Sequence, residues 1–273
     1  MKLVDIYEKC DFLAPKTLSD EYCTRYEAYD NSGILIDTGD EITGVIFSLD
    51  FSLQAINKAE QTGANLIITH HPAIYGKIGD LRVSDFDPLD SKLVRCLKKG
   101  ISVISMHLNL DCAKEGIDES LAKALGKTGE ETLMHPLSIG GYGRAYEVEK
   151  TCLGDFVGNV KINLRAKQVL IYGEHDTKIT RVASFCGGGA DENSVRFAKE
   201  QGADVIVSSD FKHHIITLAK ECNLAVIALT HYASECYGFE KFYQKIRRSI
   251  SMPCEFCTDE CKISSLFLIS ICS

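Results

Sequence analysis

The sequence lacks long runs of basic or apolar residues. Its longest basic stretches are pairs such as Arg247 and Arg248, and the formal net charge of the 273 residues is −8. Proteins that bind the phosphate backbone of nucleic acid normally carry a basic patch, so nucleic acid is a poor candidate for the main ligand. No apolar run approaches the roughly 18 residues that span a membrane, and we expect no membrane segment.

An export signal is also missing. The N-terminal stretch MKLVDIYEKCDFLAP has acidic residues where a signal peptide has an uninterrupted apolar core. The twelve cysteines are scattered, and several of them, such as Cys96, Cys186 and Cys222, fall within helix or strand patterns as small core residues do. We therefore expect reduced thiols and a cytoplasmic protein.

A second C-x2-C pair is absent as well. Cys254, Cys257 and Cys261 form one C-x2-C-x3-C cluster near the end of the chain. Three thiolates can hold zinc or iron, but structural zinc sites normally use four ligands with paired spacing. We favour a cysteine-rich final strand and tail over a metal site at this cluster.

Short apolar segments alternate with amphipathic segments along most of the chain. The composition, 45% hydrophobic and 25% charged, is that of an ordinary globular protein. The predicted strands are 45–50, 66–70, 102–107, 168–172, 181–186, 205–208 and 225–230. The predicted helices are 53–61, 91–99, 118–125, 193–201, 214–221 and 235–247. This alternation predicts an α/β fold.

Two segments resemble each other: AEQTGANLIITHH, from Ala59, and AKEQGADVIVSSD, from Ala198. Each runs from a helix end through a glycine cap into an apolar strand that ends in polar residues. The repeat predicts two related, tightly packed α/β halves with mixed sheets, residues 1–130 and 131–273, because no long low-complexity linker separates them.

Side chains that bind metals gather at four predicted strand ends. They are His70 and His71, His107 with Asp111, Asp210 with His213 and His214, and His231 with Glu235. Ligands of open α/β sheets bind at the carboxyl ends of the strands. A single histidine there is more often a hydrogen-bonded surface or core residue, but six of the eight histidines lie in these clusters. The pattern predicts a metal site built from imidazoles and carboxylates.

The spacing within the clusters suggests how ions would be held. Neighbours on an extended backbone point in opposite directions, so His70 and His71 can reach two ions, or one ion and a neighbouring group. His231 and Glu235 are four residues apart at a strand-to-helix transition and project from one face of the first turn. A carboxylate there can bridge two cations. Such mixed ligands suit zinc, iron, manganese and cobalt, and the imidazoles exclude an all-oxygen calcium site.

Two glycine-rich stretches have alternative interpretations. FCGGGADE, residues 185–192, precedes a predicted helix and could hold an anion at Gly187–Gly189, but a tight turn that needs positive φ is the favoured reading. In GGYGR, Arg144 could bind a phosphate or carboxylate, and a solvated arginine in a turn is at least as plausible.

The motifs together resemble a known family. In chain order they are YDNSGILI, SLDFSLQAINKA, NLIITHHPAIYG, ISVISMHLNLD, GGYGR, FCGGGADE, GADVIVSSDFKHH and THYASE. This set is similar to the interacting-factor-three-like (NIF3-like) family of dinuclear metal proteins, whose members are also named GTP cyclohydrolase I type two homologues. The resemblance covers about residues 29–238. It implies a two-lobed α/β subunit that assembles into a ring-shaped homohexamer.

The resemblance also implies a ligand set for two divalent ions per subunit, which could be zinc, iron or manganese. It assigns one ion to His70, Asp111 and Glu235. The other ion would be held by His71, His231 and the same Glu235. It places His107 and His214 nearby, where we assign them to substrate contact, proton relay or ligand orientation.

This sequence departs from the family pattern in two places. The segment between residues 126 and 178 leaves little room for the inserted domain of longer members, and Ser209 replaces a glycine before Asp210. The implied function is a metal-dependent hydrolase that activates a bridging water and acts on a small molecule, with GTP or a related heterocycle as the family's candidate. The alternative is a metal-binding, metal-delivery or scaffold protein without turnover.

Overall fold

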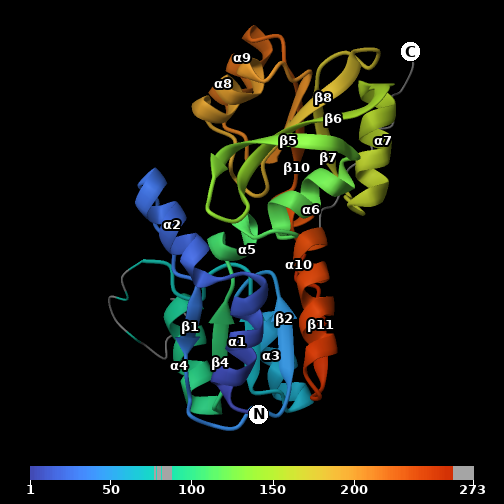
Figure 1. Cartoon of the computed structure of the whole chain (residues 1–273). Coiled ribbons are helices and arrows are strands. Elements are labelled where there is room, and N and C mark those ends of the chain that lie inside the picture. The colour runs from blue at the N-terminus through green and yellow to red at the C-terminus, as the bar shows by residue number, and fades with distance from the viewer. Residues whose placement is uncertain (77, 79–80, 82–87, 261–273) are drawn as a thin grey trace, which may run out of the picture.

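Two α/β lobes make up the structure, a computed structural model that describes residues 1–76, 78, 81 and 88–260 (Figure 1). Each lobe is built on one mixed sheet with helices on both faces, as the sequence predicts. Among the described residues, every helix is too short or too polar to cross a lipid bilayer.

The first sheet has five strands in the order β1-β4-β3-β2-β11. Their bounds are Gly33–Ile36 (β1), Ser102–Ser105 (β4), Leu66–Thr69 (β3), Val45–Ser48 (β2) and Cys254–Cys257 (β11). All but β1 run parallel. Every residue of β2, β3 and β4 is buried, which explains why these segments read as continuous apolar runs.

Helices cover both faces of this sheet. On one face, Ile46 and Ile67 pack with α3 (Leu53–Thr62) and α4 (Pro88–Lys99). On the other face, Phe47 belongs to the large core that includes α1 (Leu3–Leu13) and the 19-residue α10 (His231–Ser249). Two further helices, α2 (Lys16–Tyr26) and the short α5 (Leu108–Cys112), lie between this sheet and the second lobe (Figure 1).

The second sheet has six strands in the order β5-β6-β8-β9-β10-β7. Their bounds are Lys127–Pro136 (β5), Gly141–Cys152 (β6), Lys178–Ser184 (β8), Val205–Ser209 (β9), Ala225–Leu229 (β10) and Val169–Tyr172 (β7). Strands β8, β9 and β10 are parallel, and the others pair antiparallel. Helices α8 (Glu192–Glu200) and α9 (His213–Glu221) pack on one face, whereas α6 (Ile117–Ala124) and α7 (Leu153–Asn163) join the large core on the other.

Each sheet contains its own copy of a strand-helix-strand-helix-strand unit, in the order that the sequence repeat predicts. It runs β2-α3-β3-α4-β4 in the first lobe and β8-α8-β9-α9-β10 in the second. Ser52 and Asp191 cap the first helix of each unit through their side chains. Gly63 and Gly202 follow those helices with φ of 72° and 67°, a conformation that glycine adopts without steric cost.

The end of the chain departs from the predicted division at residues 130 and 131. Helix α10 starts between the lobes and runs down beside the first sheet (Figure 1). It returns the chain to pair β11 with β2, although the division assigned these residues to the second half. The pairing of β11 with β2 joins segments that are far apart in the sequence, so the local sequence pattern could not predict it. The boundary itself stays a prediction.

The cysteine cluster is divided between the two faces of the first sheet. Cys254 and Cys257 are three residues apart on β11, so Cys254 joins the large core and Cys257 joins the core under α3 and α4. The favoured reading of a cysteine-rich final strand is therefore confirmed for these two thiols. Cys261 lies outside the described residues, and all ten described cysteines are free.

Candidate metal centre

Five of the predicted site residues meet between the two lobes. His70 and His71 follow β3, Asp111 lies in α5, and His231 and Glu235 occupy the first turns of α10. The side chain of Thr230 accepts a hydrogen bond from the Ala233 amide at 3.1 Å, which starts α10 at His231. His231 and Glu235 therefore project from one face, as their spacing predicts.

Glu235 lies at the middle of the cluster. Its Oε2 is 3.0 Å from His71 Nε2 and 3.7 Å from His70 Nε2, and its Oε1 is 3.0 Å from His231 Nε2. His70 Nε2 is also 3.6 Å from Asp111 Oδ1. Glu235 thus faces both the pair His70–Asp111 and the pair His71–His231, the position that a bridging ligand requires.

Hydrogen bonds fix the rings of His70 and His71. The carbonyl of Met106 accepts from His70 Nδ1 at 2.8 Å, and Asp50 Oδ1 accepts from His71 Nδ1 at 2.7 Å. A proton held on Nδ1 leaves the Nε2 lone pair of each neutral ring directed at the cluster. Metal-binding histidines are oriented in this way.

His231 and His107 are held by carboxylates in the same manner. Asp210 accepts from His231 Nδ1, and Asp30 Oδ1 accepts from His107 Nδ1 at 2.7 Å. Asp210 itself has φ of 52°. Aspartate tolerates this left-handed conformation better than most residues, so the turn forms without the glycine that Ser209 replaces.

The donor atoms fit a divalent cation. His70 Nε2 is fully buried and has no hydrogen-bond partner among the described residues. His71 Nε2 and His231 Nε2 are 3.1 Å apart, so their lone pairs would repel without positive charge between them. Atoms that share an ion at bond lengths of about 2.0–2.2 Å lie at such separations. Two overlapping donor groups result, His70–His71–Glu235 and His70–His107–Asp111.

The cluster attracts positive charge. Burial alone would lower the pKa of His71, but hydrogen bonds to Asp50 and Glu235 outweigh it and raise that pKa to about 10. Burial is likewise outweighed at His231, where Glu235 and Asp210 raise the pKa to about 9. Burial would raise the pKa of Glu235, yet the neighbouring imidazoles hold it well below its usual range. A divalent cation can supply the charge that protons otherwise supply.

The two predicted auxiliary histidines differ in position. His107 belongs to the second donor group, beside His70 and Asp111. His214 lies exposed in the first turn of α9, and its side chain makes no hydrogen bond or ion pair with any described residue. Its assignment to the site, like the division of ligands between two ions, stays a prediction.

The glycine run forms a turn against the cluster. Gly187 has φ of 57°, and a Cβ there would overlap Glu235 Oε1. Its amide donates to Ser234 Oγ at 3.0 Å, and its carbonyl accepts from Ser209 Oγ at 2.7 Å. A Cβ at Gly189 would likewise overlap the Tyr142 hydroxyl. The backbone groups of Gly187 are occupied within the protein, which supports the tight turn that the sequence favours.

Arg144 is buried rather than solvated. Its side chain is 1% exposed and forms ion pairs with Asp118, at 2.9 Å, and with Glu131. Asp118 Oδ1 also accepts from the Cys186 amide at 3.0 Å, and the Cys186 thiol donates to Asp111 at 3.3 Å. The carboxylates that Arg144 binds are therefore internal, and the predicted solvated arginine was wrong.

A cavity of about 610 Å³ opens beside the cluster. His71 and His231 line it, together with Asp50, Asp259 and Glu260. Oδ1 of Asp259 is buried without a hydrogen-bond partner among the described residues, and burial raises the pKa of this carboxyl. Glu260 is ion-paired with Lys167, and Asp50 is hydrogen-bonded to His71, so the carboxylates on this side of the centre are largely paired within the protein.

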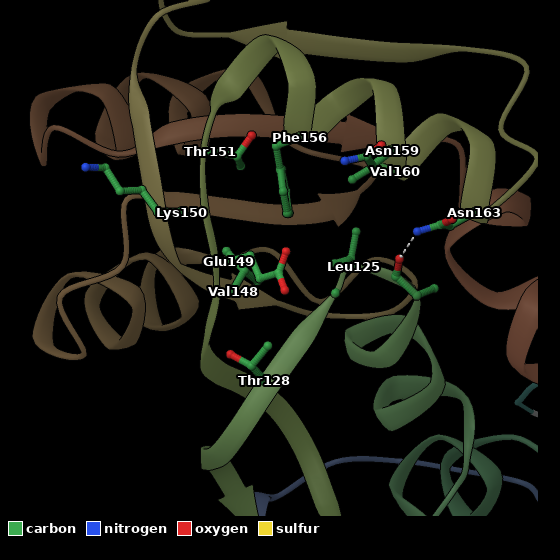
Figure 2. Close-up of a pocket in the computed structure, with 12 residues that line it drawn as sticks. Leu125, Thr128, Val148, Glu149, Lys150, Thr151, Phe156, Asn159, Val160 and Asn163 are labelled. Atoms are coloured by element: carbon green, nitrogen blue, oxygen red, sulfur yellow. Dashed lines mark hydrogen bonds between the residues drawn. The ribbon is translucent and has the colours of Figure 1, made fainter.

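A second cavity, of about 420 Å³, lies far from the cluster in the second lobe. Figure 2 shows Phe156 and Asn159 of α7 facing it across from Leu125, with Asn163 hydrogen-bonded to the Ala124 carbonyl at 2.8 Å. Histidine and cysteine are absent from its lining. We assign no chemistry to it.

Two of the three carboxylates that hold the histidines were not among the predicted site residues. Asp30, Asp50 and Asp210 each accept from an imidazole, but only Asp210 stood in a recognised cluster. Asp50 ends the predicted strand 45–50 and could have been found by the strand-end rule. Asp30 stood in the motif YDNSGILI, but it is 77 positions from His107, and that separation gave no signal of their contact.

Comparisons with known proteins find relatives over nearly the whole chain. A family model described as Duf34/NIF3 (NGG1p interacting factor 3) matches residues 1–262. A Clostridium perfringens protein named GTP cyclohydrolase 1 type 2 homolog is 30% identical over 261 residues, covering 94% of this chain and 95% of that protein. A Methanocaldococcus jannaschii protein with the same name is 28% identical over 254 residues, covering 92% and 97%. The crystal structure of the Staphylococcus aureus hypothetical protein SA1388 superposes with a TM-score of 0.80 at 26% identity, covering 94% of this chain and 96% of that one.

Proposed function

The chain belongs to the Duf34/NIF3 family, and on that premise we propose that it is a metal-dependent hydrolase acting on a small molecule. The observation that carries the proposal is the convergence of His70, His71 and His231 on Glu235, with each Nδ1 held by an acceptor. Several aligned imidazoles around a buried carboxylate are typical of metal sites that activate water.

Five residues would hold two divalent cations: His70, His71, Asp111, His231 and Glu235. Bound together, such cations supply Lewis acidity, lowering the pKa of a water toward neutrality and stabilising oxyanion charge. Zinc, iron and manganese all suit the donor set. Glu235 faces both groups of imidazoles and is the residue that would keep the two ions close together.

The protein's own residues would handle protons and orientation. His107 lies beside His70 and Asp111, and Asp30 fixes its ring through Nδ1. An imidazole held in this way can accept or donate a proton at Nε2 when a substrate is bound. His214 is assigned the same role in the sequence prediction, and its exposed position at α9 makes it the weaker candidate.

The names of the relatives suggest GTP as a substrate for testing. The carboxylates of Asp50 and Glu260 in the cavity beside the centre are paired with His71 and Lys167, so they do not exclude a triphosphate from that side.

Glu235→Gln tests the proposal. Wild type and variant are reconstituted separately with zinc, iron(II) and manganese, and each is assayed on GTP, guanosine and generic phosphoesters. We expect turnover of at least one substrate by wild type and a loss of about a hundredfold or more in the variant. His175→Ala, which removes an exposed histidine outside the cluster, is the matched control. Equal turnover in wild type and Glu235→Gln would refute the mechanism.

A metal-delivery protein without turnover is the second candidate. The cavity beside the centre favours it, since Oδ1 of Asp259 has no hydrogen-bond partner among the described residues and would attract a divalent cation towards His71 and His231. A delivery protein should release its metal to a chelator within minutes, whereas a catalytic site should retain it. Release kinetics with a coloured chelator separate the two candidates.

We also propose that the chain acts in the cytoplasm as a homohexamer. Six chains of 30.2 kDa would give about 180 kDa. Light scattering on the purified protein measures this mass, and a value near that of one chain would contradict the assembly without bearing on the metal centre.

A further inference from the structure

Two exposed tyrosines stand beside the metal centre on the side of His107. The rings of Tyr29 and Tyr75 pack edge to face with centroids 5.5 Å apart, and Tyr75 packs edge to face on His107 at 6.4 Å. Tyr29 is 54% exposed and Tyr75 is 61% exposed. Two large rings are thus exposed to solvent beside His107: Tyr75 contacts that imidazole directly, and Tyr29 contacts Tyr75.

The segment that carries Tyr29 is fastened to the centre. Asp30 holds His107 Nδ1, and Ser32 Oγ accepts from the His107 amide at 3.1 Å. Asn31 donates to the carbonyl of Ile74 at 2.7 Å, which ties the segment to the residue before Tyr75. Each residue from 29 to 32 therefore contacts either His107 or the loop after β3. These contacts hold the tyrosines in place before any ligand arrives.

We propose that Tyr29 and Tyr75 form a stacking subsite for the planar heteroaromatic ring of a molecule bound at the metal centre. Aromatic side chains bind such rings through their faces with little dependence on the ring's substituents. Because the pair adjoins His107, a stacked ring would present its edge to that imidazole. The inference rests on the proposed function and specifies which residues would hold the ring of its substrate.

Preorganisation makes the subsite effective. Ordering a free side chain on binding costs affinity, and the hydrogen bonds of Asp30, Asn31 and Ser32 have already met part of that cost in the free protein. The subsite carries no cationic group of its own in these contacts, so it would select for the ring rather than for a phosphate.

Binding of guanosine to the zinc-loaded full chain tests the inference. Calorimetry gives the dissociation constants of wild type, Tyr29→Ala, Tyr75→Ala and Tyr75→Phe, with adenosine and uridine as further rings and ribose as a probe without one. We expect about a tenfold weaker binding of guanosine by each alanine variant, less than about a threefold change in Tyr75→Phe, and no comparable binding of ribose. Zinc content should stay at the wild-type level in all variants.

Phe12→Ala is the matched control, because Phe12 is an exposed aromatic on α1, 85% exposed and outside these contacts. It should bind guanosine as wild type does. Unchanged guanosine binding in both alanine variants, or no binding of any of the three nucleosides by wild type, would overturn the inference. So would a change in oligomer mass in the alanine variants, which would make the pair a contact between copies.

The two proposals fail separately. Tyrosine-dependent binding without turnover by any metal form would support the subsite and refute the hydrolase. Turnover that depends on Glu235 but has the same KM in wild type, Tyr29→Ala and Tyr75→Ala would support the hydrolase and overturn the subsite.

Discussion

His71 and His231 come from different lobes, and their Nε2 atoms lie 3.1 Å apart. Each ring already donates its Nδ1 proton to a carboxylate, Asp50 for His71 and Asp210 for His231. Two lone pairs and the Glu235 carboxylate would therefore face one another unless a proton or a cation lies among them. This contact joins the start of α10 to the end of β3, so a cation here would also fasten the two lobes together.

Metal should therefore stabilise the fold. A cation at 100 times its dissociation constant adds about 2.7 kcal/mol to the free energy of unfolding, which for a chain of this size raises Tm by roughly 5–10 °C. Differential scanning calorimetry of the metal-free protein with and without zinc or manganese measures the shift. His71→Ala should lose most of it and His175→Ala should keep it. An equal shift in both variants would place the metal elsewhere.

Protons should compete with the metal over a defined pH range. The folded-state pKa is raised from about 6.5 to about 10 at His71 and about 9 at His231. The stability that these two groups contribute to the metal-free protein is therefore fully present below pH 6.5 and is lost as pH rises through about 9 and 10. Metal affinity should rise over the same pH range, because metal binding needs neutral imidazoles.

Two measurements check this pH dependence. Calorimetric titration of zinc near pH 7, in buffers with different ionisation enthalpies, should reveal proton release on binding. The Tm of the metal-free protein should fall between pH 7 and 9, and manganese should reduce that fall. Binding without proton release at pH 7 would show that the imidazoles are already neutral.

Much of this centre could be predicted from local sequence. The carboxyl ends of neighbouring parallel strands meet at one edge of a sheet, so His70 and His71, after β3, could be placed beside His107, after β4. His231 follows β10 of the other sheet, so its approach to His71 could not be predicted by this rule. All seven predicted strands are present, and β2, β3, β4 and β9, which are buried along their whole length, gave the clearest apolar runs. Strand β5, KTGEETLMHP, was missed because most of its residues are at least partly exposed and it has no apolar run.

Other features depend on tertiary contacts. Asp30 reaches His107 across 77 positions, and β11 reaches β2 through α10. Arg144 looks like a surface residue in a glycine-rich turn, and only the approach of Asp118 and Glu131 makes it an internal ion pair. None of these partners lies close enough in sequence to leave a periodic pattern.

The glycine at position 187 should be required for metal binding. A Cβ in Gly187→Ala would displace the Glu235 carboxylate, and φ of 57° adds about 1–2 kcal/mol of strain. We expect a loss of at least about tenfold in zinc affinity with the circular dichroism spectrum retained. Gly188→Ala is the matched control, since its nearest neighbour is Asp210 Oδ2 at 3.7 Å. Competition with a coloured chelator gives both affinities, and equal affinities would contradict this role.

Asp210 combines a backbone role with a side-chain role, and two substitutions separate them. Its carboxylate holds His231, and its φ of 52° shapes the turn after β9. Both Asp210→Gly and Asp210→Ala remove the carboxylate, so each should weaken zinc binding by about 10- to 100-fold. Only alanine is strained at this φ. The free energy of unfolding of Asp210→Gly should therefore exceed that of Asp210→Ala by about 1 kcal/mol. Chelator competition and urea unfolding measure the two effects independently. If the glycine variant bound zinc as wild type does, the hydrogen bond from His231 would have no part in holding the metal.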